Sequence, residues 1–268
     1  MTGPIVERVL RSSRYRDVDR TLLDRLAAEE LPKSRSADEA VKRVKRRLHQ
    51  AVGAYRGARG TDPLARIRAA WSGDMAEAAF RDACGETMRG HASTAERLPY
   101  LDRFFAPIWE LTGAPPASLL DLGCGLGPLA LPWMGLDPSA TYHAVDVDGR
   151  SLEVVDDFLG LVGQPHATDA RDVVADGPPP GQYEVALLLK LVPLLDRQDP
   201  AAATRLLRDL AARHAVVAFP ARSLGGGRRG MEATYRRRLN ELVAELGMGR
   251  AGEASVENEL VFVLTLDG

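Results

Sequence analysis

Residues 118–127 read SLLDLGCGLG, and this stretch decides the fold. A short apolar run, 118–122, passes directly into a glycine-rich turn. Such an order is typical of a parallel sheet that binds a ligand at its carboxyl edge, where glycine lets the backbone approach the ligand closely. Pro128 stands where a dinucleotide fingerprint has its third glycine, and no Gly-Lys-Ser/Thr follows, so neither a GxGxxG site nor a phosphate-binding P-loop is indicated.

Further apolar runs lie downstream and alternate with helical patterns, at residues 142–147, 185–189, 214–219 and 260–266. Strands that alternate with helices predict an α/β fold with a mostly parallel sheet covered on both faces. Upstream, residues 4–112 carry apolar side chains at three- and four-residue steps and show no strand pattern. We therefore expect an all-helical N-terminal domain over residues 1–105 and an α/β domain over residues 106–268.

Composition excludes several classes of protein. The 268 residues are 45% hydrophobic and 27% charged, with a formal net charge of -2, which fits a globular protein and not a fibrous or disordered one. No apolar run is long enough to span a membrane and no signal peptide is visible, so we expect a cytoplasmic protein without a membrane partner. Cys84 and Cys124 are too few and too far apart to predict a metal site or a structural disulfide.

Positive charge gathers near the N-terminus. Residues 1–60 contain 15 Lys and Arg against 8 Asp and Glu. The densest part, 42–47, follows a Ser36–Glu39 capping box and carries its apolar residues at helical spacing. This pattern predicts a helix with one buried and one cationic face, which suits a polyanionic partner. An ordinary solvated helix face explains the same pattern equally well.

Acidic residues follow two of the predicted strands. The run YHAVDVD (142–148) places Asp146 at the end of the second strand, where a carboxylate accepts hydrogen bonds from the ribose hydroxyls of a nucleoside. The alternative is a helix-capping residue. Residues 168–172 follow a third predicted strand, and either Asp169 or Asp172 is a candidate for contact with an adenine, unless both are ordinary turn carboxylates.

Five segments then occur in a fixed order: HASTAER (91–97), DLGCGLGPLAL (121–131), LLLK (187–190), FPARSLGGGRRGMEATY (219–235) and ENELVFVL (257–264). The acid-x-Gly-x-Gly turn with Asp146 resembles the class I S-adenosylmethionine-dependent methyltransferases. Together the segments resemble the aminoglycoside-resistance methyltransferases that modify guanine N7 at position 1405 of 16S rRNA. This resemblance implies a Rossmann-like, seven-stranded, mostly parallel sheet and S-adenosyl-L-methionine as cofactor, with S-adenosyl-L-homocysteine as product. It also implies the assembled 30S subunit as substrate, and we expect a monomer.

The resemblance assigns roles to single residues. Arg97 would bind the methionine carboxylate, and Lys190 would border the transferred methyl group and the target base in a positioning role. No general base is expected, because guanine N7 already carries a free lone pair. The cofactor-binding residues expected are His91, Ser93, Thr94, Arg97, Asp121, Gly123, Cys124, Gly125, Asp146, Val147, Asp169, Asp172 and Lys190.

RNA contacts are expected in the basic N-terminal segment and around the GGGRRG stretch. The residues are Lys33, Arg35, Lys42, Arg43, Lys45, Arg46, Arg47, Arg222, Arg228, Arg229, Met231, Tyr235 and Arg236. Core packing is an equal alternative for Met231 and Tyr235. Two other functions stay open. One is a methyltransferase that acts on another rRNA position or on a small molecule, with the helices as a lid in the latter case, and the other is a non-enzymatic ribosome-binding module. The intact glycine-rich turn, Asp146 and Lys190 argue against the module.

Overall fold

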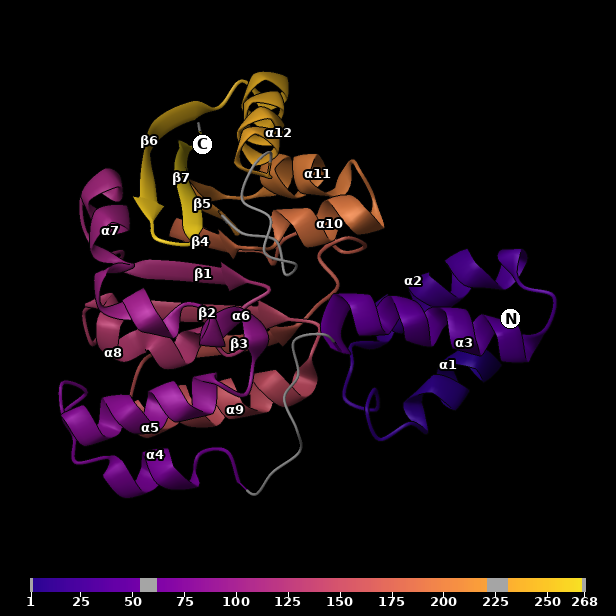
Figure 1. Cartoon of the computed structure of the whole chain (residues 1–268), viewed down its shortest axis with the longest axis horizontal. Coiled ribbons are helices and arrows are strands. Elements are labelled where there is room, and N and C mark those ends of the chain that lie inside the picture. The colour runs from indigo at the N-terminus through magenta and orange to yellow at the C-terminus, as the bar shows by residue number, and fades with distance from the viewer. Residues whose placement is uncertain (1, 54–61, 221–230, 267–268) are drawn as a thin grey trace.

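The protein contains one seven-stranded sheet with a group of N-terminal helices beside it (Figure 1). The computed structural model describes residues 2–53, 62–220 and 231–266. The sheet order is β3-β2-β1-β4-β5-β7-β6. Its strands are β1 (Ser118–Leu122), β2 (Thr141–Asp146), β3 (His166–Ala170), β4 (Tyr183–Leu189), β5 (Ala212–Pro220), β6 (Gly249–Val256) and β7 (Glu259–Thr265). The predicted α/β class with a mostly parallel sheet is confirmed.

Parallel pairing brings the site together. Strand β1 pairs in parallel with β2 and β4, and β4 pairs in parallel with β5. Only β7 runs antiparallel, between β5 and β6. The carboxyl ends of β1, β2 and β4 therefore meet at one edge of the sheet, and this edge carries the glycine-rich turn, Asp146 and Lys190.

The five apolar runs are confirmed as strands β1, β2, β4, β5 and β7, and the other two strands differ from expectation. Strand β3 contains residues 168–170, which we expected to follow it. Strand β6 was not expected, because its sequence GRAGEASV has no apolar run. Its position explains this: β6 lies at the sheet edge, pairs only with β7 and leaves most of its residues exposed.

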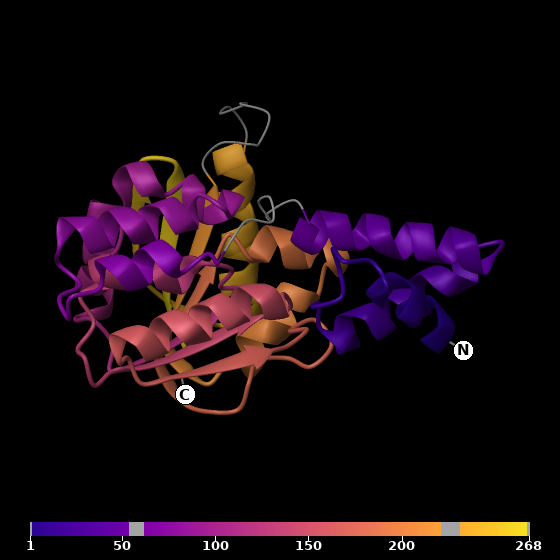
Figure 2. The same cartoon turned by 90° about the horizontal axis from the view of Figure 1, so that it is seen from below.

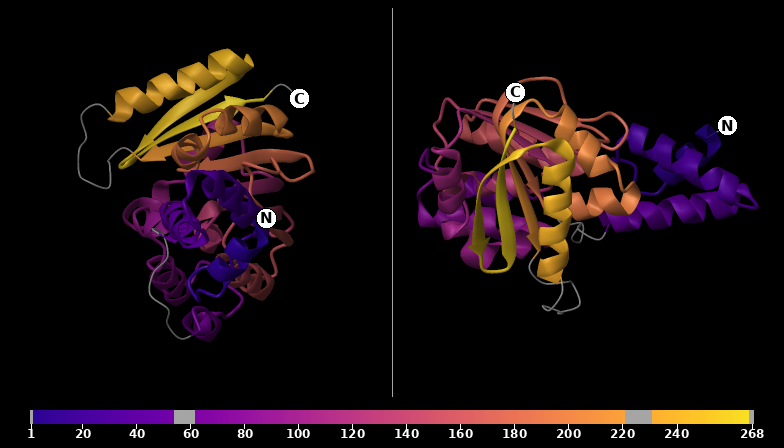
Figure 3. Two further views of the ribbon diagram at one scale, coloured as in Figure 1. Left: turned by 90° about the vertical axis from the view of Figure 1, so that its right-hand side faces the viewer. Right: turned by 90° about the horizontal axis from the view of Figure 1, so that it is seen from above.

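Helices cover both faces of the sheet because successive strand residues point to opposite sides. Leu119 and Leu187 pack on one side, and Leu120 and Leu188 on the other. The first face is covered by α4 (Ala65–Ala70), α5 (Ala78–Met88), η3 (Leu98–Arg103), α7 (Ala106–Thr112), η4 (Gly127–Ala130), α8 (Leu131–Met134) and α9 (Gly149–Val162), with α6 (Ala92–Ala95) between α5 and η3. The second face is covered by α10 (Val192–Gln198), α11 (Ala202–Asp209) and α12 (Met231–Leu246), and Figure 3 shows α12 beside the β7–β6 end.

A separate core holds the first helices together. They are α1 (Gly3–Leu10), α2 (Arg20–Glu30), η1 (Leu31–Lys33), α3 (Ala37–Leu48) and the π-helical turn η2 (His49–Gly53). Val9, Leu23 and Leu48 are fully buried in this cluster. The predicted capping box is confirmed in its first half at the start of α3, where the Ser36 side chain accepts a hydrogen bond from the Glu39 N–H, whereas the Glu39 carboxylate accepts from the Arg35 N–H. We call residues 2–53 the N-terminal unit, and it extends to one side of the sheet (Figure 2).

The packing clusters divide the chain earlier than residue 105. Helices α4 to α7 are helical as predicted, but Phe80, Tyr100, Phe104 and Trp109 pack in the same core as the sheet. Periodicity reveals that a helix has an apolar face, but not which surface that face meets. We propose that the domain boundary lies between residues 53 and 62. Among the described residues, no helix is long and apolar enough to cross a membrane.

Candidate functional site

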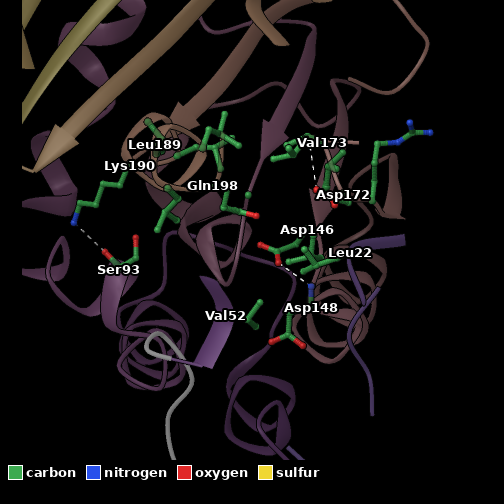
Figure 4. A pocket seen from close by; sticks show the side chains of 18 of the residues that line it. Leu22, Val52, Ser93, Asp146, Asp148, Asp172, Val173, Leu189, Lys190 and Gln198 are labelled. Atoms are coloured by element: carbon green, nitrogen blue, oxygen red, sulfur yellow. Dashed lines mark hydrogen bonds between the residues drawn. The ribbon is translucent and has the colours of Figure 1, made fainter. Parts of the chain in front are cut away.

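A cavity opens at the carboxyl edge of the sheet, next to the ends of β1, β2 and β4 (Figure 4). Its walls combine apolar side chains with a few polar groups, which is typical of small-molecule sites. Several residues expected to bind a cofactor line it: His91, Ser93, Gly123, Asp146, Val147, Asp172 and Lys190. The segments that carry them are far apart in the sequence, and the strand ends and following loops bring them together.

The glycine-rich turn has a backbone that favours glycine. Gly123 and Gly125 have φ values of 68° and 52°. A Cβ atom on Gly125 would lie 2.8 Å from the His91 ring, so a side chain does not fit there without displacing the histidine. The Gly125 N–H donates a hydrogen bond of 2.8 Å to Asp146 Oδ2. The turn therefore fixes the carboxylate at the end of β2.

Asp146 is held by backbone groups on both oxygens. Besides Gly125, the Asp148 N–H donates to its Oδ1 at 2.9 Å. Burial raises the pKa of Asp146 to about 6, although these hydrogen bonds favour the ionised form. A carboxylate has about four acceptor positions, and the backbone N–H groups do not fill all of them. This geometry fits the two ribose hydroxyls of a nucleoside.

The structure separates the two candidates for the adenine side. Asp172 lines the cavity and is only 2% exposed. Arg25 of α2 holds it with hydrogen bonds from Nε to Oδ2 at 2.6 Å and from an Nη to Oδ1 at 3.2 Å. Asp169 accepts a bond from Arg171 Nε and does not line the cavity. The geometry favours Asp172 for this contact, which stays a prediction.

Lys190 follows β4 directly and adopts a φ of 63°, in the left-handed region that non-glycine residues seldom visit. Its Nζ donates to Glu96 Oε2 at 2.7 Å and lies 3.5 Å from Glu259 Oε1. The side chain is 11% exposed, and these carboxylates supply the partners that a buried ammonium requires. Strained backbone at the rim of a cavity is typical of functional positions.

Arg97 is placed differently from what its expected role suggests. It is 3% exposed and does not line the cavity. Its Nε and one Nη bond the two oxygens of Glu259 at 2.9 and 2.8 Å, and Tyr100 also donates to Glu259. Burial raises the pKa of Glu259, but the cationic partners outweigh this effect and hold the pKa below its ordinary value. In this structure the guanidinium fork binds a protein carboxylate, and the cofactor contact of Arg97 remains a prediction.

Three other expected cofactor residues, Thr94, Asp121 and Cys124, are buried and do not line the cavity. Thr94 donates to the Met88 carbonyl, and Tyr142 donates to Asp121 Oδ2 at 2.8 Å. Burial raises the pKa of Asp121 to about 6 and that of the Cys124 thiol well above its usual value. These side chains support the turn that carries Gly123 and Gly125. Within the described residues, no cluster of His, Cys, Asp and Glu side chains suits a metal ion.

The basic residues of the N-terminal unit fall into two groups. Some form ion pairs with α2: Lys33 and Arg43 bond Glu30, and Arg47 bonds both Glu29 and Glu30. The others project from α3 or precede it, and Lys42, Arg46 and Arg35 are exposed while Lys45 is partly so. Some of the basic residues in 33–47 therefore join α3 and η1 to α2 through ion pairs, and the others form a cationic surface.

The second expected RNA segment is described only in part. Arg222, Arg228 and Arg229 lie outside the described residues. Tyr235 stacks on Phe219 with ring centroids 4.8 Å apart, Met231 is half-buried, and Arg236 pairs with Glu232 and Glu253. Tyr235 therefore packs against the hydrophobic core between α12 and the second face of the sheet, as the core-packing alternative expects, and its RNA contact remains a prediction.

Sequence reasoning missed several residues in and around the site. Arg25 looks like any other cation of residues 1–60, and nothing near it in the sequence marks its contact with Asp172. Glu259 lies inside the ENELVFVL segment but had no role assigned. Leu22, Val52 and Gln198 also line the cavity without any sequence signal.

Comparisons with known proteins give the fold and site a family. A family described as ribosomal RNA methyltransferase (FmrO) matches residues 11–263. A 16S rRNA (guanine(1405)-N(7))-methyltransferase of Frankia casuarinae is 40% identical over 96% of this chain and 91% of its own. The enzyme of the same name from Micromonospora echinospora is 34% identical over 97% and 95%.

Solved structures agree over the whole chain. The crystal structure of the 16S rRNA methyltransferase RmtF in complex with S-adenosyl-L-homocysteine has a TM-score of 0.83 at 29% identity, covering 99% of this chain and 98% of that one. The 16S rRNA methylase RmtB gives a TM-score of 0.80 at 25% identity, covering 100% and 99%. The chain therefore belongs to the FmrO family of ribosomal RNA methyltransferases.

Proposed function

We propose that this protein transfers a methyl group from S-adenosyl-L-methionine to N7 of guanine 1405 in 16S rRNA and so gives resistance to aminoglycosides. The observation that carries the proposal is the likeness to enzymes of this name along nearly the whole chain, 40% over 96% of it in the Frankia casuarinae relative. The geometry at the end of β2 supports it independently, since Gly125 holds the Asp146 carboxylate at the rim of the cavity, where a nucleoside could bind.

S-adenosyl-L-methionine supplies an electrophilic methyl group on a sulfonium when it is bound. In this proposal Asp146 accepts the ribose hydroxyls and Asp172 faces the adenine, while Gly123 lets the backbone come close. Lys190 stands at the end of β4 as a positioning residue, held by Glu96 and Glu259. Guanine N7 attacks with its own lone pair, so alignment of nucleophile and methyl group suffices and no residue needs to remove a proton.

Docking to RNA is assigned to the exposed cations. Lys42 and Arg46 lie one turn apart on α3 and are solvent-exposed, which suits contact with phosphates and predicts salt-dependent binding. A base in a paired region must leave the stack before its N7 can reach the cofactor, and contacts elsewhere must offset that cost. We therefore infer that the substrate is the assembled 30S subunit, met by a monomer of this protein in the cytoplasm.

Transfer of labelled methyl groups to purified 30S subunits tests the proposal, with naked 16S rRNA and 50S subunits as controls. We expect incorporation into 30S subunits alone, and its loss in an Asp146→Asn variant. Cofactor binding without transfer to any ribosomal particle would favour the small-molecule methyltransferase in which the helices form a lid. A protein that binds 30S subunits but no cofactor would be the non-enzymatic module.

A further inference from the structure

The N-terminal unit is joined by backbone hydrogen bonds to the loop that carries Asp146. The Asp19 N–H donates to the Val147 carbonyl, and the Gly149 N–H donates to the Asp17 carbonyl, both at 2.8 Å. Val18 and Asp148 form an antiparallel bridge between these bonds. A Cβ atom on Gly149 would lie 2.7 Å from the Asp17 carbonyl oxygen, so this close approach depends on glycine. The unit thus abuts the residues that follow the ribose-side carboxylate.

A second connection reaches the opposite side of the cavity. Arg25 is 15% exposed and bonds Asp172 through Nε and one Nη. The same Nη donates to Gln198 Oε1 at 2.7 Å, and the other donates to Glu29 Oε1 at 3.0 Å. One guanidinium therefore ties α2 to the loop after β3 and to the end of α10. Planar, bidentate geometry of this kind orients a carboxylate better than a single charge does.

The unit also supplies part of the cavity wall. Leu22 of α2 and Val52 of η2 line it together with Asp146 and Asp172 (Figure 4). Val147, the residue after Asp146, packs against the core of the N-terminal unit. The cavity is therefore completed by side chains from both parts of the chain.

Asp172 retains an acceptor position after these contacts. Its Oδ2 accepts from Arg25 Nε, and its Oδ1 accepts from an Arg25 Nη and from the Val174 N–H. A carboxylate offers about four lone-pair positions, so one remains on Oδ2. Because Arg25 occupies the other position on Oδ2 and one of the two on Oδ1, it determines the direction in which the free position points.

We propose that Arg25 is a positioning residue of the cofactor site, and that the N-terminal unit completes this site, so that cofactor binding and docking of the unit stabilise one another. The inference rests on the proposed cofactor, S-adenosyl-L-methionine. Coupling of this kind is reciprocal, because each ligand changes the affinity for the other by the same factor. RNA that binds only the docked N-terminal unit would therefore tighten cofactor binding, and bound cofactor would tighten the binding of that RNA.

Calorimetric titration of the full-length protein with S-adenosyl-L-homocysteine tests the proposal without any ribosome. We expect Arg25→Ala to weaken binding by about tenfold, as the loss of a hydrogen bond to a charged group does. Arg25→Lys restores the charge without the fork and recovers only part of the affinity. The matched control is Arg20→Ala on the same helix, whose side chain is 61% exposed and pairs with Glu7, and it should bind as the unsubstituted protein does.

A double-mutant cycle with Asp172→Asn separates positioning from folding. If Arg25 acts through Asp172, removing Arg25 has little further effect on affinity in the Asp172→Asn protein. Gly149→Ala, which pushes the N-terminal unit away from the loop, provides a second route to the same loss of affinity. Unchanged affinity in Arg25→Ala and Gly149→Ala, with or without a lower melting temperature, would overturn the inference. An unsubstituted protein that binds no S-adenosyl-L-homocysteine would overturn the proposed cofactor instead.

Discussion

Gly125 shows how a missing side chain shapes the cofactor site. Its φ of 52° is strained for any residue with a side chain, and a Cβ atom there would lie 2.8 Å from the His91 ring. We expect Gly125→Ala to weaken S-adenosyl-L-homocysteine binding at least tenfold, because the turn and the carboxylate that it holds must shift. Gly135→Ala is the matched control, with a φ of 64° and open space around it, so it carries the backbone strain without the clash. Equal affinities of the two variants would contradict this account.

The protonation of Asp146 predicts a pH dependence. Burial raises its pKa to about 6, and only the ionised carboxylate accepts hydrogen bonds from both ribose hydroxyls with full strength. The affinity is therefore highest above this pKa, where the carboxylate is ionised, and it falls as the pH drops through the pKa. We expect affinity for S-adenosyl-L-homocysteine to drop about tenfold between pH 7 and pH 5, measured by titration at each pH.

An Asp146→Asn variant is the control for this pH dependence. Asp121 also has a pKa raised to about 6 by burial, but it does not line the cavity. The variant should bind weakly at every pH and lose most of the dependence. If the unsubstituted protein bound S-adenosyl-L-homocysteine equally well at pH 7 and pH 5, the proposed role of the Asp146 carboxylate would be wrong.

Glu259 is the buried carboxylate that pairs with Arg97 and lies next to Lys190. It is fully buried and neutralises Arg97, so Glu259→Gln leaves a buried guanidinium without a charged partner. We expect the free energy of unfolding to fall by about 3–5 kcal/mol, measured by urea titration. Glu257→Gln, which alters an exposed pair with Arg103, should change it by less than about 0.5 kcal/mol. A similar small change for both would show that the buried pair contributes little.

The position of a candidate site residue can be predicted from the sequence where a local pattern determines it. Gly123 and Asp146 each stand at a strand end, which a short window of sequence reveals. Arg25 and Glu259 were missed because their partners, Asp172 and Arg97, are 147 and 162 residues away. Neither charge has a signature of its own, and only the folded chain brings the partners within hydrogen-bonding distance.

At the scale of elements, α3 carries two kinds of cation on its polar face, one exposed and one paired within the protein. Lys42 and Arg46 are exposed, whereas Arg43 binds the buried carboxylate of Glu30 at 2.7 Å. We expect the Lys42→Ala, Arg46→Ala double variant to bind 30S subunits about tenfold more weakly in filter-binding assays and to melt as the unsubstituted protein does. Arg43→Ala should instead lose about 1–3 kcal/mol of stability. The reverse assignment, with Arg43 required only for binding, would refute this division.

Elements were predictable to the extent that they bury apolar residues. Strands β1, β4 and β5 are central, and their continuous apolar runs mark them in the sequence. Edge strand β6 has no such run, because solvent covers most of it. Helices α4 to α7 were recognised as helices, but their partner surface was not. A helix shows the same periodic pattern whether its apolar face meets other helices or a sheet.

In the whole molecule, the N-terminal unit, to which we assign RNA docking, meets the sheet domain at the cavity. Asp17 and Asp19 pair with the loop after β2, and Arg25 binds the loop after β3. These few contacts therefore connect the N-terminal unit to the walls of the cavity. The family resemblance indicated both activities from the sequence, but their junction depends on contacts that appear only in the folded protein.

The most direct test of the central claim is to map the methylated nucleotide. Purified 30S subunits are treated with the protein and S-adenosyl-L-methionine, the RNA is cleaved with borohydride and aniline at N7-methylguanine, and the breaks are located by reverse transcription. The account predicts one new stop, at guanine 1405, that is absent when Asp146→Asn replaces the unsubstituted protein. A stop at another nucleotide, or methyl incorporation without cleavage, would contradict it.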